Sequence, residues 1–355
     1  MRLAPGVVAA LIQLDLFRLW VPRRVGGREL DLPGTLRVYE AAAYAEGSVG
    51  WAVMIGSGGG LFAAYLDPDA AYAIYSRPES VIAGSGAPEG RAERVAGGYR
   101  ATGHWRYASG AQYATTFTAN CLVTEDGTQV VGKDGQPLVR AMAFDRQQVS
   151  VMPAWDTSGM RGTGSDDFEV SDAFVPGQRT FSVFTDPPLE AGVLYRLPFG
   201  VLTELPVASV TLGIARHALD AFRVLARHKR SPGLTVPLAP VLAGDPLTQG
   251  RFAESYATWQ SVKAGLELLA GQAWQTALSG RQLTSRELAE ITAGCVTAVA
   301  RLRSAVGELI TLAGMTGIQM GEDLARAWRD LQAVAMHGSV SARRLATAGS
   351  VLLSE

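Results

Sequence analysis

Residues Gly97 to Gly110 read GGYRATGHWRYASG and are the most informative segment of the sequence. It predicts a β-hairpin, because Gly97-Gly98 supplies the positive-φ pair of a two-residue turn and β-type residues flank it. The second strand contains Trp105 and ends at Ala108-Ser109-Gly110, where small residues let another group approach the backbone closely. A large aromatic plane followed by a hydroxyl and bare peptide N–H groups suits a flat ligand ring with polar edges. The alternative is an ordinary sheet hairpin with one tryptophan packed inward.

The composition is that of a globular protein with a large core. The chain has 355 residues, of which 48% are hydrophobic, enough for two or three subdomains. Its net charge of −1 creates no basic field, so we expect neither nucleic acid nor an anionic membrane as a partner. The two cysteines, Cys121 and Cys295, predict no disulfide framework and fit a cytoplasmic location. The four histidines include no pair at metal-ligand spacing, so no metal centre is expected.

Three zones follow one another along the chain. Residues 1–80 are expected to form a helical domain, and residues 81–185 a β-barrel or sandwich, because short β-type runs alternate with Gly, Asp and Pro turns. Residues 198–355 repeat apolar side chains at helical spacing, which predicts an antiparallel four-helix bundle. The fold class is therefore α+β, mainly α. We expect strands at 81–82, 98–107, 116–123, 138–144 and 167–175, and helices after Pro206 and over 252–278, 285–316 and 324–353, with an irregular linker from Ser231 to Gly250.

One apolar region, residues 41–66, is long enough to span a bilayer. It contains Glu46 and a run of glycines at Gly56, Gly58, Gly59 and Gly60. Because a charge and helix-breaking glycines interrupt it, we interpret this region as a buried segment rather than a membrane helix.

Two further motifs lie downstream of the hairpin. Residues 156–165 read DTSGMRGTGS, followed by DFEV at 167–170 and AFVP at 173–176. Near the end, residues 326–331 read RAWRDL and His337-Gly338 follows. Together with the pattern Gly-x-Trp-x-x-Ala-Ser-Gly, these motifs resemble, in family order, the acyl-CoA dehydrogenase superfamily. They are most similar to its branch of two-component flavin-dependent monooxygenases, and the resemblance extends from about Leu16 to Gly349.

The resemblance implies both architecture and activity. The helical, β and bundle zones would form one subunit of a homotetramer. The chain would be an oxygenase component that takes reduced FMN from a separate flavin reductase. With O₂ it would hydroxylate a small organic substrate or oxidise its nitrogen or sulfur. The sequence contains no nicotinamide-binding motif, which is consistent with flavin reduction by another protein.

The resemblance also implies the site residues. Ser109 would hydrogen-bond near the reactive ring nitrogen of the flavin, and His337 would act as an acid–base group because its pKa lies near neutrality. The expected cofactor contacts are Trp105, Ala108, Ser109 and Gly110 from the hairpin, Trp155, Gly162, Thr163 and Gly164 from the second motif, and Arg227 and Arg230 from the end of the first bundle helix. The alternatives are a turn hydroxyl for Ser109, a solvent-facing histidine for His337, and an ordinary basic helix end for the arginines.

Departures from the family pattern bear on which reaction, which flavin and which substrate we expect. Dehydrogenases carry a catalytic glutamate where this chain has Met336-His337-Gly338. Their Arg-x-x-Phe-Gly element lacks its Phe-Gly here, since Ser231-Pro232-Gly233 follows Arg230, and this favours FMN over FAD. Many aromatic hydroxylases of the branch have a histidine after the position of Gly50-Trp51. This chain has a glycine run instead, which could make room for a bulkier substrate. An FAD-dependent acyl-CoA dehydrogenase and a non-catalytic scaffold of this fold are the alternative functions.

Overall fold

The structure is a computed structural model that describes residues 2–230 and 240–354. Contacts within the chain divide it into two compact units. We call Met1–Asp31, Ala52–Asp156 and Arg161–Phe199 the sheet unit, and Leu32–Trp51, Thr157–Met160 and Gly200–Glu355 the helical unit. The expected linker falls partly outside the described residues, because these omit 231–239. The grouping differs from the three predicted domains in giving Leu32–Trp51 to the bundle helices, and the three-domain division stays a prediction.

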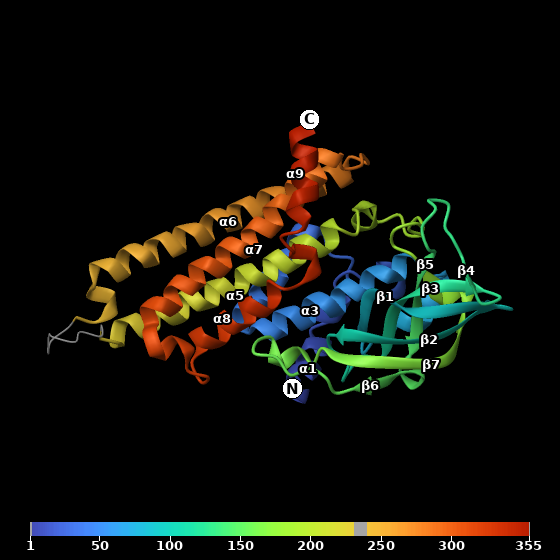
Figure 1. Cartoon of the computed structure of the whole chain (residues 1–355), viewed down its shortest axis with the longest axis horizontal. Coiled ribbons are helices and arrows are strands. Elements are labelled where there is room, and N and C mark those ends of the chain that lie inside the picture. The colour runs from blue at the N-terminus through green and yellow to red at the C-terminus, as the bar shows by residue number, and fades with distance from the viewer. Residues whose placement is uncertain (1, 231–239, 355) are drawn as a thin grey trace. The chain divides into compact units, whose positions relative to one another are not determined.

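The sheet unit contains a mixed sheet (Figure 1). Its strands in the described residues are β1 (Ile82–Val95), β2 (Gly98–Ala108), β3 (Thr116–Glu125), β4 (Thr128–Gln129), β5 (Val139–Asp145), β6 (Ser150–Met152), β7 (Asp166–Pro176) and β8 (Thr180–Phe181). They are ordered β6-β7-β2-β1-β3-β5-β8, with β4 paired to β3. β1 and β3 run parallel, and the other pairs are antiparallel. All five predicted strand regions are strands, whereas β4, β6 and β8 were not predicted.

The sheet curls around an aromatic core. β7 and β3 are three strand spacings apart in the sheet order, which would be about 14 Å in a flat sheet. Yet the rings of Phe168 on β7 and Phe117 on β3 have centroids only 5.1 Å apart. Trp105 on β2 stacks on Phe168 at 5.1 Å and also reaches Phe144 on β5 at 5.9 Å. Side chains from strands on both sides of the sheet order therefore meet in one interior, as the predicted barrel requires.

The hairpin forms, but its turn lies one residue earlier than predicted. Val95 pairs with Gly98, so the two turn residues are Ala96 and Gly97. Only Gly97 has a positive φ, of 78°. Gly98 is needed for a different reason, since a Cβ there would lie 2.2 Å from the carbonyl oxygen of Val175 on β7. The sequence therefore identified a hairpin correctly and assigned the wrong role to its second glycine.

The helices of the N-terminal region are α1 (Pro5–Gln13), α2 (Leu32–Ala45), α3 (Gly47–Gly59) and α4 (Pro68–Tyr75). A stretch of the described residues, Gly47–Ala64, is apolar and long enough to span a membrane, and 78% of it is buried, as in a core helix. Three of its glycines, Gly56, Gly59 and Gly60, pack against protein, whereas a Cβ at Gly58 would meet nothing within 4 Å. A Cβ at Gly56 would lie 2.4 Å from Phe17 and one at Gly59 would lie 2.6 Å from Ile82. The expectation that this run makes room for a bulky substrate is wrong at these positions, because side chains already fill the space.

The helical unit is built around α5 (Val201–His228). The other long helices are α6 (Pro246–Leu278) and α7 (Ser285–Ala313), followed by the shorter α8 (Asp323–Val334) and α9 (Arg344–Ser354) (Figure 1). α2, α6, α7 and α8 all contact α5, and α9 contacts α7. α5 begins before Pro206, so the predicted start after this proline is wrong. The buried carboxylate of Glu204 links α5 to α7 and α9, because it accepts hydrogen bonds from Thr292 (2.8 Å) and Arg344.

The fourth predicted bundle helix, residues 324–353, is wrong as a single helix. The structure breaks it into α8 and α9, and the short 3₁₀ turn Gly338–Val340 lies between them. His337 precedes this turn with extended backbone angles, and its ring accepts a hydrogen bond from the backbone N–H of Ser339. Apolar side chains continue at helical spacing across the break, so the pattern did not reveal it.

The Trp105 ring depends on two glycines that leave room for it. A Cβ at Gly90 on β1 would lie 2.1 Å from Trp105 Cζ2, and a Cβ at Gly103 would lie 2.6 Å from its Cη2. We expect Gly90→Ala to destabilise the protein by about 1–3 kcal/mol, because the ring cannot move within a filled core. Urea unfolding monitored by tryptophan fluorescence measures this loss.

Gly86→Ala is the matched control for that substitution. Gly86 lies on the same strand, and a Cβ there would meet nothing within 4 Å. Both substitutions reduce the flexibility of the unfolded chain alike, so their difference isolates the clash. Equal stability of the two variants would contradict the proposed packing.

Candidate functional site

Trp105 is a core residue. Its side chain is fully buried and its Nε1 donates a hydrogen bond to the carbonyl oxygen of Asn120 (3.0 Å). The indole therefore has no exposed surface to offer a cofactor, which corrects the expectation that this ring contacts a flavin. Trp105 is therefore the inward-packed tryptophan of an ordinary hairpin. The candidate site is the polar end of its strand, Ala108-Ser109-Gly110.

The structure joins the first two motifs at the end of β2. Ala108 pairs with Asp166 across the β2–β7 ladder, and the N–H of Gly110 donates to the carbonyl oxygen of Thr163 (2.9 Å). Gly110 has a φ of 81° and Gly164 a φ of 53°, so each turn uses a backbone conformation that favours glycine. Predicted residues from separate parts of the sequence thus become neighbours within the sheet unit.

Three hydroxyl groups form a chain where these turns meet. Ser109 Oγ lies 2.7 Å from Ser165 Oγ, which lies 2.7 Å from Thr163 Oγ1. All three residues are buried. Ser165 was not among the predicted site residues. The sequence signal for it was present, because it ends the Gly162-Thr163-Gly164-Ser165 turn.

Asp166 fixes the segment that carries Trp155. One carboxylate oxygen accepts the backbone N–H groups of Ala154 and Trp155 (3.0 Å each), and the other accepts Gln112 Nε2 (2.6 Å). Burial opposes its ionisation, but these hydrogen bonds outweigh burial and lower the pKa of Asp166. The half-buried Trp155 ring meets Tyr107 edge-on at 6.2 Å. Tyr107 itself has a φ of 68° and lies in a bulge at the end of β2.

Tyr113 is a residue that sequence reasoning missed. Its hydroxyl is buried and has no hydrogen-bond partner among the residues that the structure describes. A Cβ on Gly110 would lie 3.1 Å from this hydroxyl and from the adjoining ring carbons. Burial raises the pKa of Tyr113, so the phenol keeps its proton and remains a donor. No motif could reveal an unpartnered phenol, because the pairing depends on the fold.

The sheet unit therefore fits a ligand with polar ring edges. The small residues Ala108 and Gly110, the hydroxyl chain and the unpartnered Tyr113 phenol lie around a single turn. A flavin has both hydrogen-bond donors and acceptors along one ring edge, and these residues can satisfy both kinds.

His337 lies in the helical unit. Its Nδ1 accepts the N–H of Ser339 (3.4 Å) and lies 2.7 Å from Ser339 Oγ. Because the Ser339 N–H donates to Nδ1, this nitrogen must carry a lone pair. The proton of the neutral ring is therefore on Nε2. Surrounding protein atoms lower the pKa of His337, although part of the side chain stays exposed to solvent. The ring also packs edge-on against Trp51, with centroids 5.3 Å apart.

Asp330 holds the loop Thr157–Met160 within the helical unit. Its carboxylate accepts the backbone N–H of Met160 (2.5 Å), and Met160 has a φ of 53°. The backbone approaches α8 so closely that a Cβ on Gly159 would lie 2.0 Å from the carbonyl oxygen of Arg329. Burial raises the pKa of Asp330 to about 6, although the Met160 hydrogen bond opposes the shift. Arg329 and Asp330 of the third motif thus contact the backbone of Gly159 and Met160 in the second motif.

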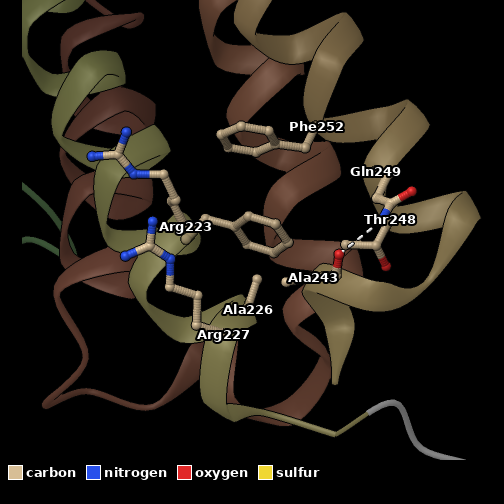
Figure 2. Close-up of a pocket in the computed structure, with 8 residues that line it drawn as sticks. Arg223, Ala226, Arg227, Ala243, Thr248, Gln249 and Phe252 are labelled. Atoms are coloured by element: carbon tan, nitrogen blue, oxygen red, sulfur yellow. Dashed lines mark hydrogen bonds between the residues drawn. The ribbon is translucent and has the colours of Figure 1, made fainter. Parts of the chain in front are cut away.

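Arg227 borders a hollow at the end of α5 (Figure 2). Arg223 and Arg227 come from successive turns of α5, while Phe252 comes from α6. Phe222 stacks on Phe252 with centroids 5.9 Å apart. Arg223 pairs with Asp220 (3.0 Å), whereas Arg227 has no partner within the described part of the chain. Arg230, three residues further along the sequence, is exposed, and its backbone forms an isolated antiparallel β-bridge with Val241.

The comparisons with known proteins agree with this architecture. The family described as "Acyl-CoA dehydrogenase, C-terminal domain" matches residues 205–342. Indole-3-acetate monooxygenase of Pseudomonas putida is 30% identical over 100% of this chain and 88% of that protein. The flavin-dependent monooxygenase oxygenase subunit HsaA of Rhodococcus jostii (strain RHA1) is 27% identical over 95% of this chain and 88% of its own length. The structure of XiaF from Streptomyces sp. with FADH2 and glycerol gives a TM-score of 0.90 at 23% identity, covering 100% of this chain and 89% of that one.

The fold and the polar turn define a flavoprotein with the acyl-CoA dehydrogenase architecture. The full-length similarity is more specific than the fold, and the chain belongs to the flavin-dependent monooxygenases of this superfamily. It is an oxidoreductase, the oxygenase component of a system that works with reduced flavin. The predicted class is confirmed, and neither the dehydrogenase nor the non-catalytic alternative is needed.

Asp330 gives a testable dependence of stability on pH. Its pKa is about 6 in the folded protein against an ordinary 3.8, so folding favours the protonated form. Its contribution to stability is therefore largest below pH 4 and is lost as the pH rises through 6. The total loss is about 3 kcal/mol. In Asp330→Asn this loss should be absent, because the amide is neutral and its oxygen can still accept from Met160.

Urea unfolding at several pH values between 4 and 8 measures this difference. Relative to the wild type, Asp330→Asn should gain stability as the pH rises from 4 to about 6, and the gain should level off above that pH. Asp323→Asn, in the exposed first turn of the same helix, is the control and should follow the wild-type curve. A constant difference between wild type and Asp330→Asn at all pH values would disprove the assignment.

Proposed function

We propose that this enzyme uses reduced FMN from a separate flavin reductase to oxidise a small aromatic compound with O₂. The single observation that carries the proposal is the buried hydroxyl chain at the end of β2, where Ser109 meets Ser165. The names of the relatives support an aromatic substrate, since one acts on indole-3-acetate. Both hydroxylation and oxidation of a ring nitrogen or sulfur fit this class.

The sheet unit would bind the reactive ring edge. Bound reduced flavin would supply the electrons that activate O₂. Ser109 would hydrogen-bond to the ring nitrogen, and the small residues Ala108, Gly110, Gly162 and Gly164 would border the ring edge. Thr163 and Trp155 would border the same ligand. Since the hydroxyl chain is buried, water would be largely excluded from these hydrogen bonds, which strengthens them.

Arg227 and Arg230 would bind the flavin phosphate. Arg227 lacks an acidic partner among the described residues, so its charge is available for a phosphate oxygen. The absence of the Phe-Gly element after Arg230 favours FMN. One observation favours FAD as a second candidate: the half-buried ring of Phe252, which lines the hollow beside Arg227, could accept an aromatic base.

His337 would act as the acid–base group of the reaction. Its lowered pKa leaves the ring neutral at pH 7. In this form Nε2–H would donate a hydrogen bond to substrate or oxygen, and the ring would take up a proton released during the reaction. A homotetrameric assembly, implied by the family resemblance, and a cytoplasmic location, suited to the two unpaired cysteines Cys121 and Cys295, complete the proposal. Light scattering of the purified protein tests the assembly.

Anaerobic titration with reduced FMN and with reduced FAD tests the proposal. We expect reduced FMN to bind more tightly, and subsequent addition of O₂ with indole-3-acetate or indole to yield an oxygenated product detected by mass spectrometry. Arg227→Gln should weaken FMN binding by about tenfold, because a charge-assisted hydrogen bond is lost. Arg251→Gln, an exposed arginine of α6 paired with Glu254, is the control. Absence of reduced-flavin binding to the wild type would refute the function.

His337→Ala should slow turnover by about 10²-fold or more, because an acid–base group typically contributes this much. Wild-type turnover should fall in acid with an apparent pKa below 6.5, as the ring becomes charged. His228→Ala changes an exposed histidine of α5 and should retain wild-type rates. A wild-type rate in His337→Ala would make this histidine an ordinary surface residue.

A further inference from the structure

We infer that Ser165 is a positioning residue that determines whether Ser109 offers a proton or a lone pair to the flavin. The inference rests on the proposed contact between Ser109 and the flavin ring. Ser165 itself would touch no ligand and would act through Ser109.

The hydrogen bonds among the three hydroxyl groups can run in either of two directions. A hydroxyl group has one proton, so Ser165 can donate to only one of its two neighbours. Both O···O distances are 2.7 Å, so each is a hydrogen bond in which one of the two hydroxyl groups is the donor. When Ser165 donates to Ser109, Ser109 keeps its own proton for a third group. When Ser109 donates to Ser165, it can offer only a lone pair outward.

The position of Ser165 is fixed while its proton can rotate. Gly164 has a φ of 53°, and the following Asp166 is held by three hydrogen bonds. On the other side, the Gly110–Thr163 backbone bond ties the two turns together (2.9 Å). The oxygen atoms cannot move apart easily, so reversal of the chain requires only rotation of hydroxyl protons.

A flavin needs both directions at its central ring nitrogen. In the oxidised ring this nitrogen carries a lone pair, and Ser109 must donate to it. In the reduced ring it carries a hydrogen, and Ser109 must accept. Ser165 makes the second arrangement possible, because it takes the proton of Ser109 inward. Loss of Ser165 should therefore weaken binding of the reduced flavin selectively.

The test compares dissociation constants for reduced and oxidised FMN. For Ser165→Ala we expect reduced FMN to bind about three- to tenfold more weakly, while oxidised FMN changes by less than about twofold. Ser165→Cys keeps a similar volume with a weakly bonding thiol and should give the same shift if the alanine variant does not fold. Ser80→Ala, which removes another buried serine hydroxyl of the sheet unit, should change neither constant.

A double-mutant cycle separates this role from a structural one. In a Ser109→Ala background, Ser165→Ala should leave both dissociation constants unchanged. An equal loss of affinity for the two forms, or a further loss in that background, would overturn the inference. The wild-type titration reports separately on the proposed function: if wild type binds reduced FMN and the Ser165 variants show no selective effect, only the role of Ser165 fails.

Discussion

The burial of the Trp105 indole is the constraint on which the sheet unit depends. The ring stacks on Phe168, reaches Phe144 and donates its N–H to a backbone carbonyl, so the curled sheet encloses both its apolar face and its polar atom. This arrangement requires bare backbone at Gly90 and Gly103. Because a filled core tolerates little movement, the ring also fixes the twist and register of β2.

The functional turn follows from that fixed strand. β2 pairs with β7 on one side, and a bulge between Trp105 and Ala108 ends the regular ladder. The chain then turns back at Gly110, and Ser109 meets the hydroxyl chain of Ser165 and Thr163 there. A site built at the end of a rigid strand is held more precisely than one on a long loop. The tryptophan thus serves the site by positioning the backbone, and its ring has no exposed surface to act on a ligand directly.

The sequence predicted the strands and long helices well because these depend on local periodicity. It failed where one pattern fits two environments. A tryptophan on a strand looks the same whether it faces a ligand or the core, and only the neighbouring Gly90 and Gly103 decide between them. The helical spacing of residues 324–353 likewise concealed the break at His337. For the site, the motifs supplied Ser109 and Thr163 as candidates, but the hydrogen bonds of Ser165 became visible only when distant segments met.

The least favourable local features are concentrated on the motifs that carry the proposed chemistry. In the sheet unit, Tyr113 buries a hydroxyl that has no partner among the described residues, which costs about 1–3 kcal/mol. In the helical unit, Asp330 is buried with a raised pKa and holds Met160 at a positive φ. Such features persist where a specific backbone path or an unsatisfied donor serves a ligand. Tyr113 lies beside Gly110, so this buried donor adjoins the same turn that carries Ser109.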